Sequence, residues 1–165
     1  MKRKYLILFS LSGLIISLDQ LLKHWFYVTL PEGVEHRLIP NLVSLTHRHS
    51  VGFAFGLLRS PPERFRELFL LGVPAFALIL VVLIFIKLRD NQTTTSLALT
   101  SIFSGAIGNL IDRVQHGFVI DFLDIKLGDR LLLPALNIAD FAIIMGVAIL
   151  LLSTVRHEVR GQSRE

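Results

Sequence analysis

The sequence predicts an all-α membrane protein with four transmembrane helices, a small extracytoplasmic β-sheet cradle and a short surface helix. Two properties of the 165-residue chain carry this prediction: 52% of its residues are apolar, and most of these gather in four long runs. A helix needs about 20 apolar residues to cross a bilayer, where it satisfies its own backbone hydrogen bonds. We therefore expect a single membrane domain over residues 1–165.

The four predicted spans cover about residues 6–22, 68–86, 97–111 and 135–155. The third span is the shortest, and it holds Ser101, Ser104, Gly105 and Gly108. Small side chains let two helices approach each other closely in lipid. We therefore expect the third span to be the central helix of the bundle.

The first span follows Lys2, Arg3 and Lys4, a pattern that also opens cleaved secretory signals. No small-x-small cleavage site follows, and Asp19 and Gln20 occupy the place where one would be expected, so we expect a retained anchor. Basic residues are also dense in 87–96 and 156–165, which predicts that both termini are cytoplasmic. The net charge of +4 then reflects topology and contact with membrane lipids, not nucleic acid binding.

Residues 30–67 are expected to form the extracytoplasmic cradle and the surface helix. The β-branched, aromatic and glycine residues of 38–58 predict a short twisted hairpin or sheet. The next segment begins at Pro61 and Pro62 and mixes charged residues with Phe65. It predicts a short helix that lies along the outer surface and leads into the second span.

Polar side chains recur at the outer ends of three spans. Ionisable and amide groups inside a membrane are costly, so each is a candidate for function. They form pairs spaced three or four residues apart, which places each pair on one helical face. The pairs are Asp19 with Lys23, Asn109 with Asp112, and Asn137 with Asp140. Because a bundle can turn these faces inward together, we expect one polar site at the outer edge of the bilayer.

Asp121 adds a further carboxylate, among apolar residues shortly after the third span. Burial raises the pKa of a carboxyl group, and a second carboxylate nearby raises it further because both cannot ionise cheaply. Two such groups suit aspartic protease chemistry, in which one takes a proton from water and the other, protonated, hydrogen-bonds the scissile carbonyl. This chemistry needs no cofactor.

Two other chemistries are disfavoured. The chain has no cysteine, which excludes thiol catalysis and thiolate metal sites. His47 and His49 share a strand face by their spacing of two, but no third ligand has convincing spacing, so we expect no metal site.

Five motifs stand in order along the chain, each near the outer end of a predicted span or in an outer segment. They are Asp19-Gln20-Leu21-Leu22-Lys23; Leu45-Thr46 leading to Gly52-Phe53-Ala54-Phe55-Gly56; Gly105-Ala106-Ile107-Gly108-Asn109-Leu110-Ile111-Asp112-Arg113; Gly117 with Val119-Ile120-Asp121-Phe122; and Asn137-Ile138-Ala139-Asp140. Together they resemble signal peptidase II, the bacterial lipoprotein signal peptidase, over most of the chain.

The resemblance implies an aspartic endopeptidase of the bacterial cytoplasmic (inner) membrane, active as a monomer. It would remove the signal peptide of a diacylglyceryl-modified prolipoprotein before the lipidated cysteine, and globomycin-type inhibitors would occupy the same groove. Asp121 and Asp140 match the catalytic pair of the family. The matching site-supporting or substrate-binding positions are Asn109, Asp112, Arg113, Asn137, Asp19, Lys23 and Gly105.

Two positions depart from the family pattern, which has asparagine at Ser50 and phenylalanine at Leu136. Ser50 keeps a hydroxyl but loses the two-sided hydrogen bonding of an amide, which affects substrate or inhibitor contacts more than the catalytic pair. Leu136 is a modest packing change.

Alternative interpretations stay open at this point. A non-cleaving relative that binds lipidated peptides is suggested by Ser50, and a small ion or proton transporter by the intramembrane polar residues. Asp112 and Arg113 could form an ion pair that caps a helix end. Lys23 could instead reach the lipid head groups.

Overall fold

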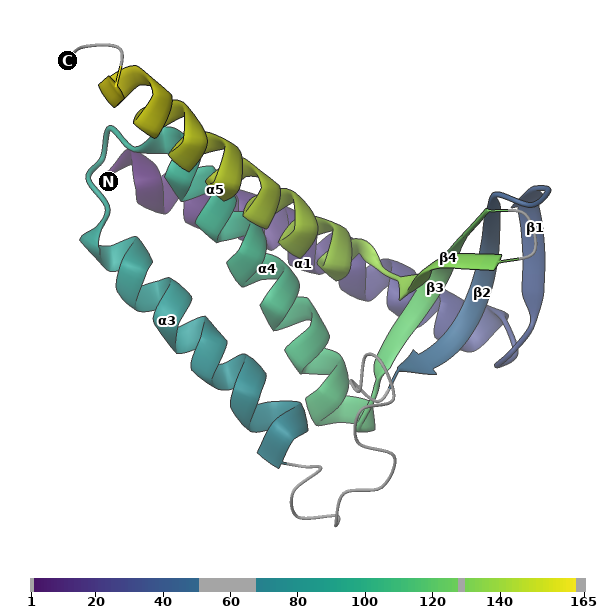
Figure 1. Ribbon diagram of the computed structural model, residues 1–165. Coiled ribbons are helices and arrows are strands. Elements are labelled where there is room, and N and C mark those ends of the chain that lie inside the picture. The colour runs from purple at the N-terminus through teal and green to yellow at the C-terminus, as the bar shows by residue number, and fades with distance from the viewer. Residues whose placement is uncertain (1, 51–67, 128–129, 163–165) are drawn as a thin grey trace.

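The computed structural model describes residues 2–50, 68–127 and 130–162. Four long helices form an elongated bundle, with a small sheet at one end and both termini at the other (Figure 1). The helices are α1 (Arg3–Thr29), α3 (Val73–Lys87), α4 (Thr93–His116) and α5 (Ile138–Gln162). A single π-helical turn, Leu68–Gly72, leads into α3, whose first turn contains Pro74.

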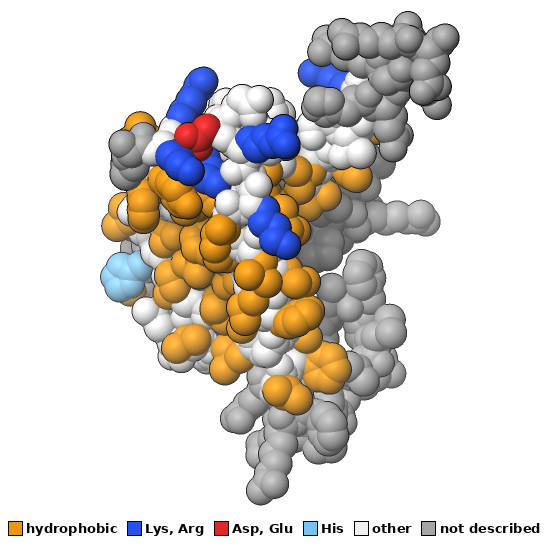
Figure 2. Space-filling view, turned by 90° about the vertical axis from the view of Figure 1, so that its left-hand side faces the viewer, with side chains coloured by type: hydrophobic (Ala, Val, Ile, Leu, Met, Phe, Trp, Pro, Cys, Tyr) orange, Lys and Arg blue, Asp and Glu red, His pale blue; other side chains and the backbone are white. Residues whose placement is uncertain are grey.

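The helices α1, α4 and α5, and α3 together with the π-helical turn before it, are long and apolar enough to cross a membrane, which confirms the predicted four-span fold. Large apolar side chains are exposed along the helices, among them Leu14, Phe76, Ile79, Leu83 and Leu151. Figure 2 shows the side of the molecule that lies on the left in Figure 1. This side is largely hydrophobic, and Lys and Arg side chains gather over its upper part. An apolar surface of this extent is stable in lipid and not in water. The protein is a multi-pass membrane protein.

The third span is the central helix, as its small residues predicted. Within its most apolar 18-residue window, 44% of α4 is buried, against 11% in each of the other three spans. It packs against α1, α3 and α5. A Cβ atom added at Gly105 would overlap the carbonyl oxygen of Ala139, and one at Gly108 would lie 2.6 Å from Asp19 Oδ2. The missing side chains therefore let α1 and the start of α5 approach α4.

Among the described residues, the sheet contains four antiparallel strands in the order β1-β2-β3-β4. The strands are β1 (Glu35–Ile39), β2 (Val43–Ser50), β3 (Val119–Leu127) and β4 (Arg130–Leu136). Asn41, with a positive φ of 61°, makes the turn between β1 and β2, as asparagine does readily. The hairpin expected over residues 38–58 overlaps β2, but β1 begins earlier than predicted, at Glu35. Residues 51–67, which include the rest of the predicted hairpin and the expected surface helix, lie outside the described residues.

Two strands were not predicted. Residues 119–127 and 130–136 read as short apolar runs, which cannot be distinguished from helix by sequence pattern alone. The fourth span was expected from residue 135, but β4 continues to Leu136 and α5 begins at Ile138. Pro134 lies in β4, which is an edge strand and so tolerates a residue that cannot donate a hydrogen bond.

Two local features join α4 and α1 to the sheet. Gly117, with φ 77°, ends α4 in the left-handed conformation and turns the chain into β3. The rings of Phe26 in α1 and Phe122 in β3 stack with their centroids 4.6 Å apart, and both are buried. The strand that carries Asp121 is therefore held against the end of α1.

Candidate functional site

The predicted polar residues converge where the bundle meets the sheet. Asp19 and Lys23 come from α1, Asn109, Asp112 and Arg113 from α4, Asp121 from β3, and Asn137 and Asp140 from the start of α5. All of these side chains except Arg113 belong to one network of hydrogen bonds and ion pairs, which also contains Gln20.

Asn137 and Asp140 form a reciprocal cap at the start of α5. The backbone N–H of Asp140 donates to Asn137 Oδ1 at 2.8 Å, and the backbone N–H of Asn137 donates to Asp140 Oδ2 at 3.2 Å. This is a capping box, which satisfies two N–H groups that a helix start otherwise leaves free. The motif therefore fixes the Asp140 carboxylate at the first turn of α5.

Asn137 also connects the two candidate catalytic carboxylates. Its side-chain Nδ2 donates to Asp121 Oδ1 at 2.7 Å, while its backbone N–H contacts Asp140 as described. Asn109 Nδ2 donates to the other oxygen of Asp140 at 2.8 Å. Asp140 thus has both oxygens hydrogen-bonded, whereas Asp121 Oδ2 accepts no hydrogen bond from the described residues. The two carboxyl groups lie on either side of a single asparagine.

Burial, and after it the nearby Asp140 carboxylate, raise the pKa of Asp121 to about 7. The hydrogen bond from Asn137 and the charge of Lys23 oppose this rise. The side chain is only 6% exposed, so bulk water does little to stabilise its ionised form. A carboxyl group with this pKa can hold or release a proton near neutral pH, as acid–base catalysis requires.

Asp112 does not pair with its neighbour Arg113. Its Oδ2 lies 2.9 Å from Lys23 Nζ, and its Oδ1 accepts from Gln20 at 2.9 Å. Lys23 is 1% exposed, so it does not extend to the lipid head groups. Arg113 is half-buried, its charge acts on Asp112, Asp121 and Asp140, and its Nε is buried without a partner among the described residues.

Ser50 and Gly105 have different relations to the site. Ser50 ends β2 directly opposite Val119, two residues along from the pair Arg48–Asp121. Gly105 contributes no polar group, but its missing side chain admits the Ala139 carbonyl next to Asp140.

Gln20 was not among the predicted site residues, yet its Nε2 donates to Asp112 and also to the Gly108 carbonyl at 3.1 Å. An amide within an apolar run is costly in a membrane, which is the signal that could have found it.

A separate cluster contains the histidines that raised the question of a metal. His49 Nε2 and His47 Nε2 are 3.1 Å apart, His47 Nδ1 lies 2.6 Å from the Leu30 carbonyl oxygen, and His49 Nδ1 lies 3.2 Å from Glu32. The His49 ring also stacks on Phe118 at 3.8 Å. Among the described residues, no group of three potential ligands could hold a metal ion.

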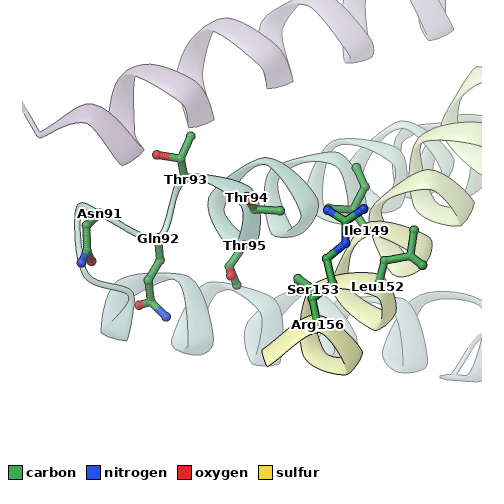
Figure 3. A pocket seen from close by; sticks show the side chains of 9 residues that line it. All are labelled: Asn91, Gln92, Thr93, Thr94, Thr95, Ile149, Leu152, Ser153 and Arg156. Atoms are coloured by element: carbon green, nitrogen blue, oxygen red, sulfur yellow. The ribbon is translucent and has the colours of Figure 1, made fainter. Parts of the chain in front are cut away.

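A cavity of about 500 Å³ lies at the opposite end of the bundle, between the start of α4 and the end of α5 (Figure 3). Its lining consists of uncharged polar and apolar side chains with one cation, Arg156. None of the described residues that line it is a carboxylate or a histidine, so it offers no acid–base pair.

Comparison with known proteins relates the chain to one family over nearly its whole length. The family described as signal peptidase (SPase) II matches residues 11–156. A lipoprotein signal peptidase of Geobacter metallireducens is 39% identical over 165 residues, covering 100% of this chain and 99% of the relative. Those of Syntrophus aciditrophicus and Brevibacillus brevis are 37% and 38% identical, covering 94% and 87% of this chain and 97% and 91% of the relatives.

Two solved structures share the fold. Both are titled as a bacterial membrane enzyme structure obtained by the in meso method. The first has a TM-score of 0.77 and 29% identity, covering 93% of this chain and 87% of that one. The second has a TM-score of 0.76 and 30% identity, with coverages of 92% and 91%.

Proposed function

The chain belongs to the signal peptidase II family, and from this premise we propose that it removes the signal peptide of diacylglyceryl-modified prolipoproteins with Asp121 and Asp140 as its catalytic pair. One observation carries the proposal: both carboxyl groups contact Asn137, in a buried site that also contains Lys23. Membership of the family supports a peptidase of lipoprotein processing. The aspartic mechanism rests on the arrangement of the two side chains.

In the proposed reaction, the two carboxyl groups share one proton. Asp121, with a pKa of about 7, holds the proton and hydrogen-bonds the scissile carbonyl oxygen. Asp140, which accepts hydrogen bonds at both oxygens, is the ionised partner and takes a proton from the attacking water. The water oxygen bonds to the carbonyl carbon, the C–N bond then breaks, and the leaving amine takes up the proton held by Asp140.

The active site then lies near the extracytoplasmic face of the inner membrane, with both termini in the cytoplasm. Basic residues support this orientation, because they lie at the helix ends remote from the sheet, and positive charge is retained on the cytoplasmic side. They include Lys2, Arg3, Lys87, Arg89 and Arg156. The sheet would form the cradle that receives the prolipoprotein or a globomycin-type inhibitor, and one chain supplies every proposed site residue, which fits a monomer.

The test is cleavage of a synthetic diacylglyceryl-modified prolipopeptide by the purified protein in lipid. Asp121→Asn and Asp140→Asn should each reduce kcat by at least about 10³-fold, since each removes a proton-transfer group. The matched control is Asp124→Asn, which changes a buried carboxylate of the same strand that bonds Arg48 at 2.9 Å, outside the site. It should retain kcat.

The outcomes separate the proposal from its alternatives. Full activity in either aspartate variant would contradict the mechanism. Binding of the lipopeptide without cleavage by the unmodified protein would indicate a non-cleaving relative. Ion flux across reconstituted vesicles, with no cleavage, would indicate a transporter.

A further inference from the structure

Lys23 is the only cation among the described residues that is bonded inside the network around Asp121 and Asp140. Its ammonium group has three N–H donors and meets three acceptors. These are Asp19 Oδ2 at 2.8 Å, Asp112 Oδ2 at 2.9 Å and Asn109 Oδ1 at 2.9 Å. Because Lys23 is only 1% exposed and all three N–H donors are used, its ammonium group is held in a single position.

The two aspartates bound by Lys23 each hold the main chain just before a catalytic residue. The backbone N–H of Ala139, which precedes Asp140, donates to Asp19 Oδ1 at 2.8 Å. The backbone N–H of Ile120, which precedes Asp121, donates to Asp112 Oδ2 at 3.1 Å. Lys23 thus connects the strand that carries one catalytic carboxylate to the helix that carries the other.

The third acceptor leads to the catalytic side chains themselves. Asn109 Oδ1 accepts from Lys23 and from Asn137 Nδ2, which orients both amides so that their N–H groups face the carboxylates. Asn109 then donates to Asp140, and Asn137 donates to Asp121. One cation therefore orders both the main chain and the side chains of the pair.

We infer that Lys23 is a positioning residue that sets the separation and orientation of Asp121 and Asp140. This inference rests on the proposed function. Asp121 lies on a strand and Asp140 on a helix. The pairing of Leu123 with Leu136 and the side chain of Asn137 join these two elements on one side. The bridge from Asp19 through Lys23 to Asp112 adds a second link between α5 and β3, which holds the main chain directly before each carboxylate.

The inference predicts a loss of kcat with little change in KM when Lys23 is replaced by methionine, which keeps the length of the side chain and removes its charge. A displacement of catalytic groups by about 1 Å costs about 100-fold in rate. KM should change little because Lys23 is 1% exposed and all three of its N–H donors are used within the protein, which leaves none for the substrate.

The same variant should shift the pH dependence of kcat to higher pH. Lys23 lowers the pKa of Asp121, so its loss allows that pKa to rise, and the limb of the profile that reports Asp121 should move to higher pH. The charged groups that face the pair from the surrounding elements are Asp19 and Lys23 of α1 and Asp112 and Arg113 of α4.

The experiment measures kcat, KM and their pH profiles for Lys23→Met in lipid, together with thermal unfolding. The matched control is Lys4→Met, because Lys4 is also a buried α1 lysine, 4% exposed, but bonds carbonyl oxygens at the end of α3, including Leu88 at 2.7 Å. Lys4→Met should lower thermal stability and leave kcat and its pH profile unchanged. A Lys23→Met protein with unchanged kcat and pH profile would overturn the inference.

A second variant keeps the test decisive if Lys23→Met does not fold. Lys23→Met combined with Asp19→Asn restores the net charge of the network. The amide oxygen introduced at position 19 can still accept the hydrogen bond from the backbone N–H of Ala139. The double variant should show the same fall in kcat; unchanged kcat would overturn the inference. Failure of the proposed function is distinguished by the unmodified protein, which would then not cleave, or by active Asp121→Asn and Asp140→Asn variants.

Discussion

Replacing Asp121 by asparagine should stabilise the folded protein above pH 7 while it abolishes hydrolysis. Asp121 is buried, and its pKa rises from 3.8 to about 7 in the folded chain. Below pH 3.8 the carboxyl group is protonated in both states and contributes nothing. Between pH 3.8 and about 7 the unfolded chain ionises first, so the free energy of unfolding falls as pH rises, and above pH 7 the loss is constant.

The rise in pKa sets the size of the effect. At 1.36 kcal/mol for each pKa unit, the change from 3.8 to about 7 corresponds to at most about 4 kcal/mol. The Asp121→Asn variant carries no charge to bury, and its amide oxygen can still accept the hydrogen bond from Asn137. We therefore expect the variant to gain up to this amount relative to the unmodified protein at pH 8, and almost nothing at pH 3.5.

The assay is reversible unfolding in detergent at several pH values, followed by the fluorescence of the single tryptophan, Trp25. Asp124→Asn is the control, because Asp124 is fully buried but paired with Arg48. That variant loses an ion pair and should be less stable than the unmodified protein at pH 8. The reasoning would be refuted if Asp121→Asn were less stable than the unmodified protein at pH 8. It would also be refuted if the difference in free energy of unfolding between the two proteins did not grow between pH 4 and pH 7.

Two further predictions concern packing around the site. Gly105→Ala should lower the free energy of unfolding by about 1–3 kcal/mol and reduce kcat, because the new methyl group overlaps the Ala139 carbonyl oxygen. The control is Gly13→Ala, at a position with open space around it. Thermal unfolding and lipopeptide cleavage should show no change in stability or kcat for this control. Phe122→Ala should cost about 3–5 kcal/mol of stability through loss of the buried stack on Phe26, and a variant as stable as the unmodified protein would show that this contact does not hold β3.

The local part of the site could be predicted from the sequence. The spacing of Asn137 and Asp140 is that of a capping box, so the same two residues that form the helix start also present the carboxylate. Asn109 and Asp112 likewise share a face of α4 because a helix places residues three apart together. Such interactions join residues within one turn of a helix, so their spacing in the sequence is enough to predict them.

The partners of each polar residue could not be predicted. The sequence offered Arg113 as the neighbour of Asp112, yet Asp112 pairs with Lys23, 89 positions earlier in the numbering. The strands β3 and β4 were missed for the same reason, since β3 forms by pairing with β2, whose residues lie some 70 positions away. Contacts between distant segments depend on how complete elements pack, which no local pattern contains.

The four membrane spans and the gathering of carboxylates, amides and a lysine at one level can be read from the order of residues in the chain. These outcomes follow from the transfer of apolar surface into lipid and from helical periodicity, both of which act residue by residue. The positions of Asp121 and Asp140 on either side of Asn137, and the link that Lys23 makes between the main chains of their two elements, depend instead on how the folded elements pack. This arrangement requires the close approach of α1, α4 and α5 at Gly105 and Gly108, because buried charges are stable only where packing brings every partner within hydrogen-bonding distance.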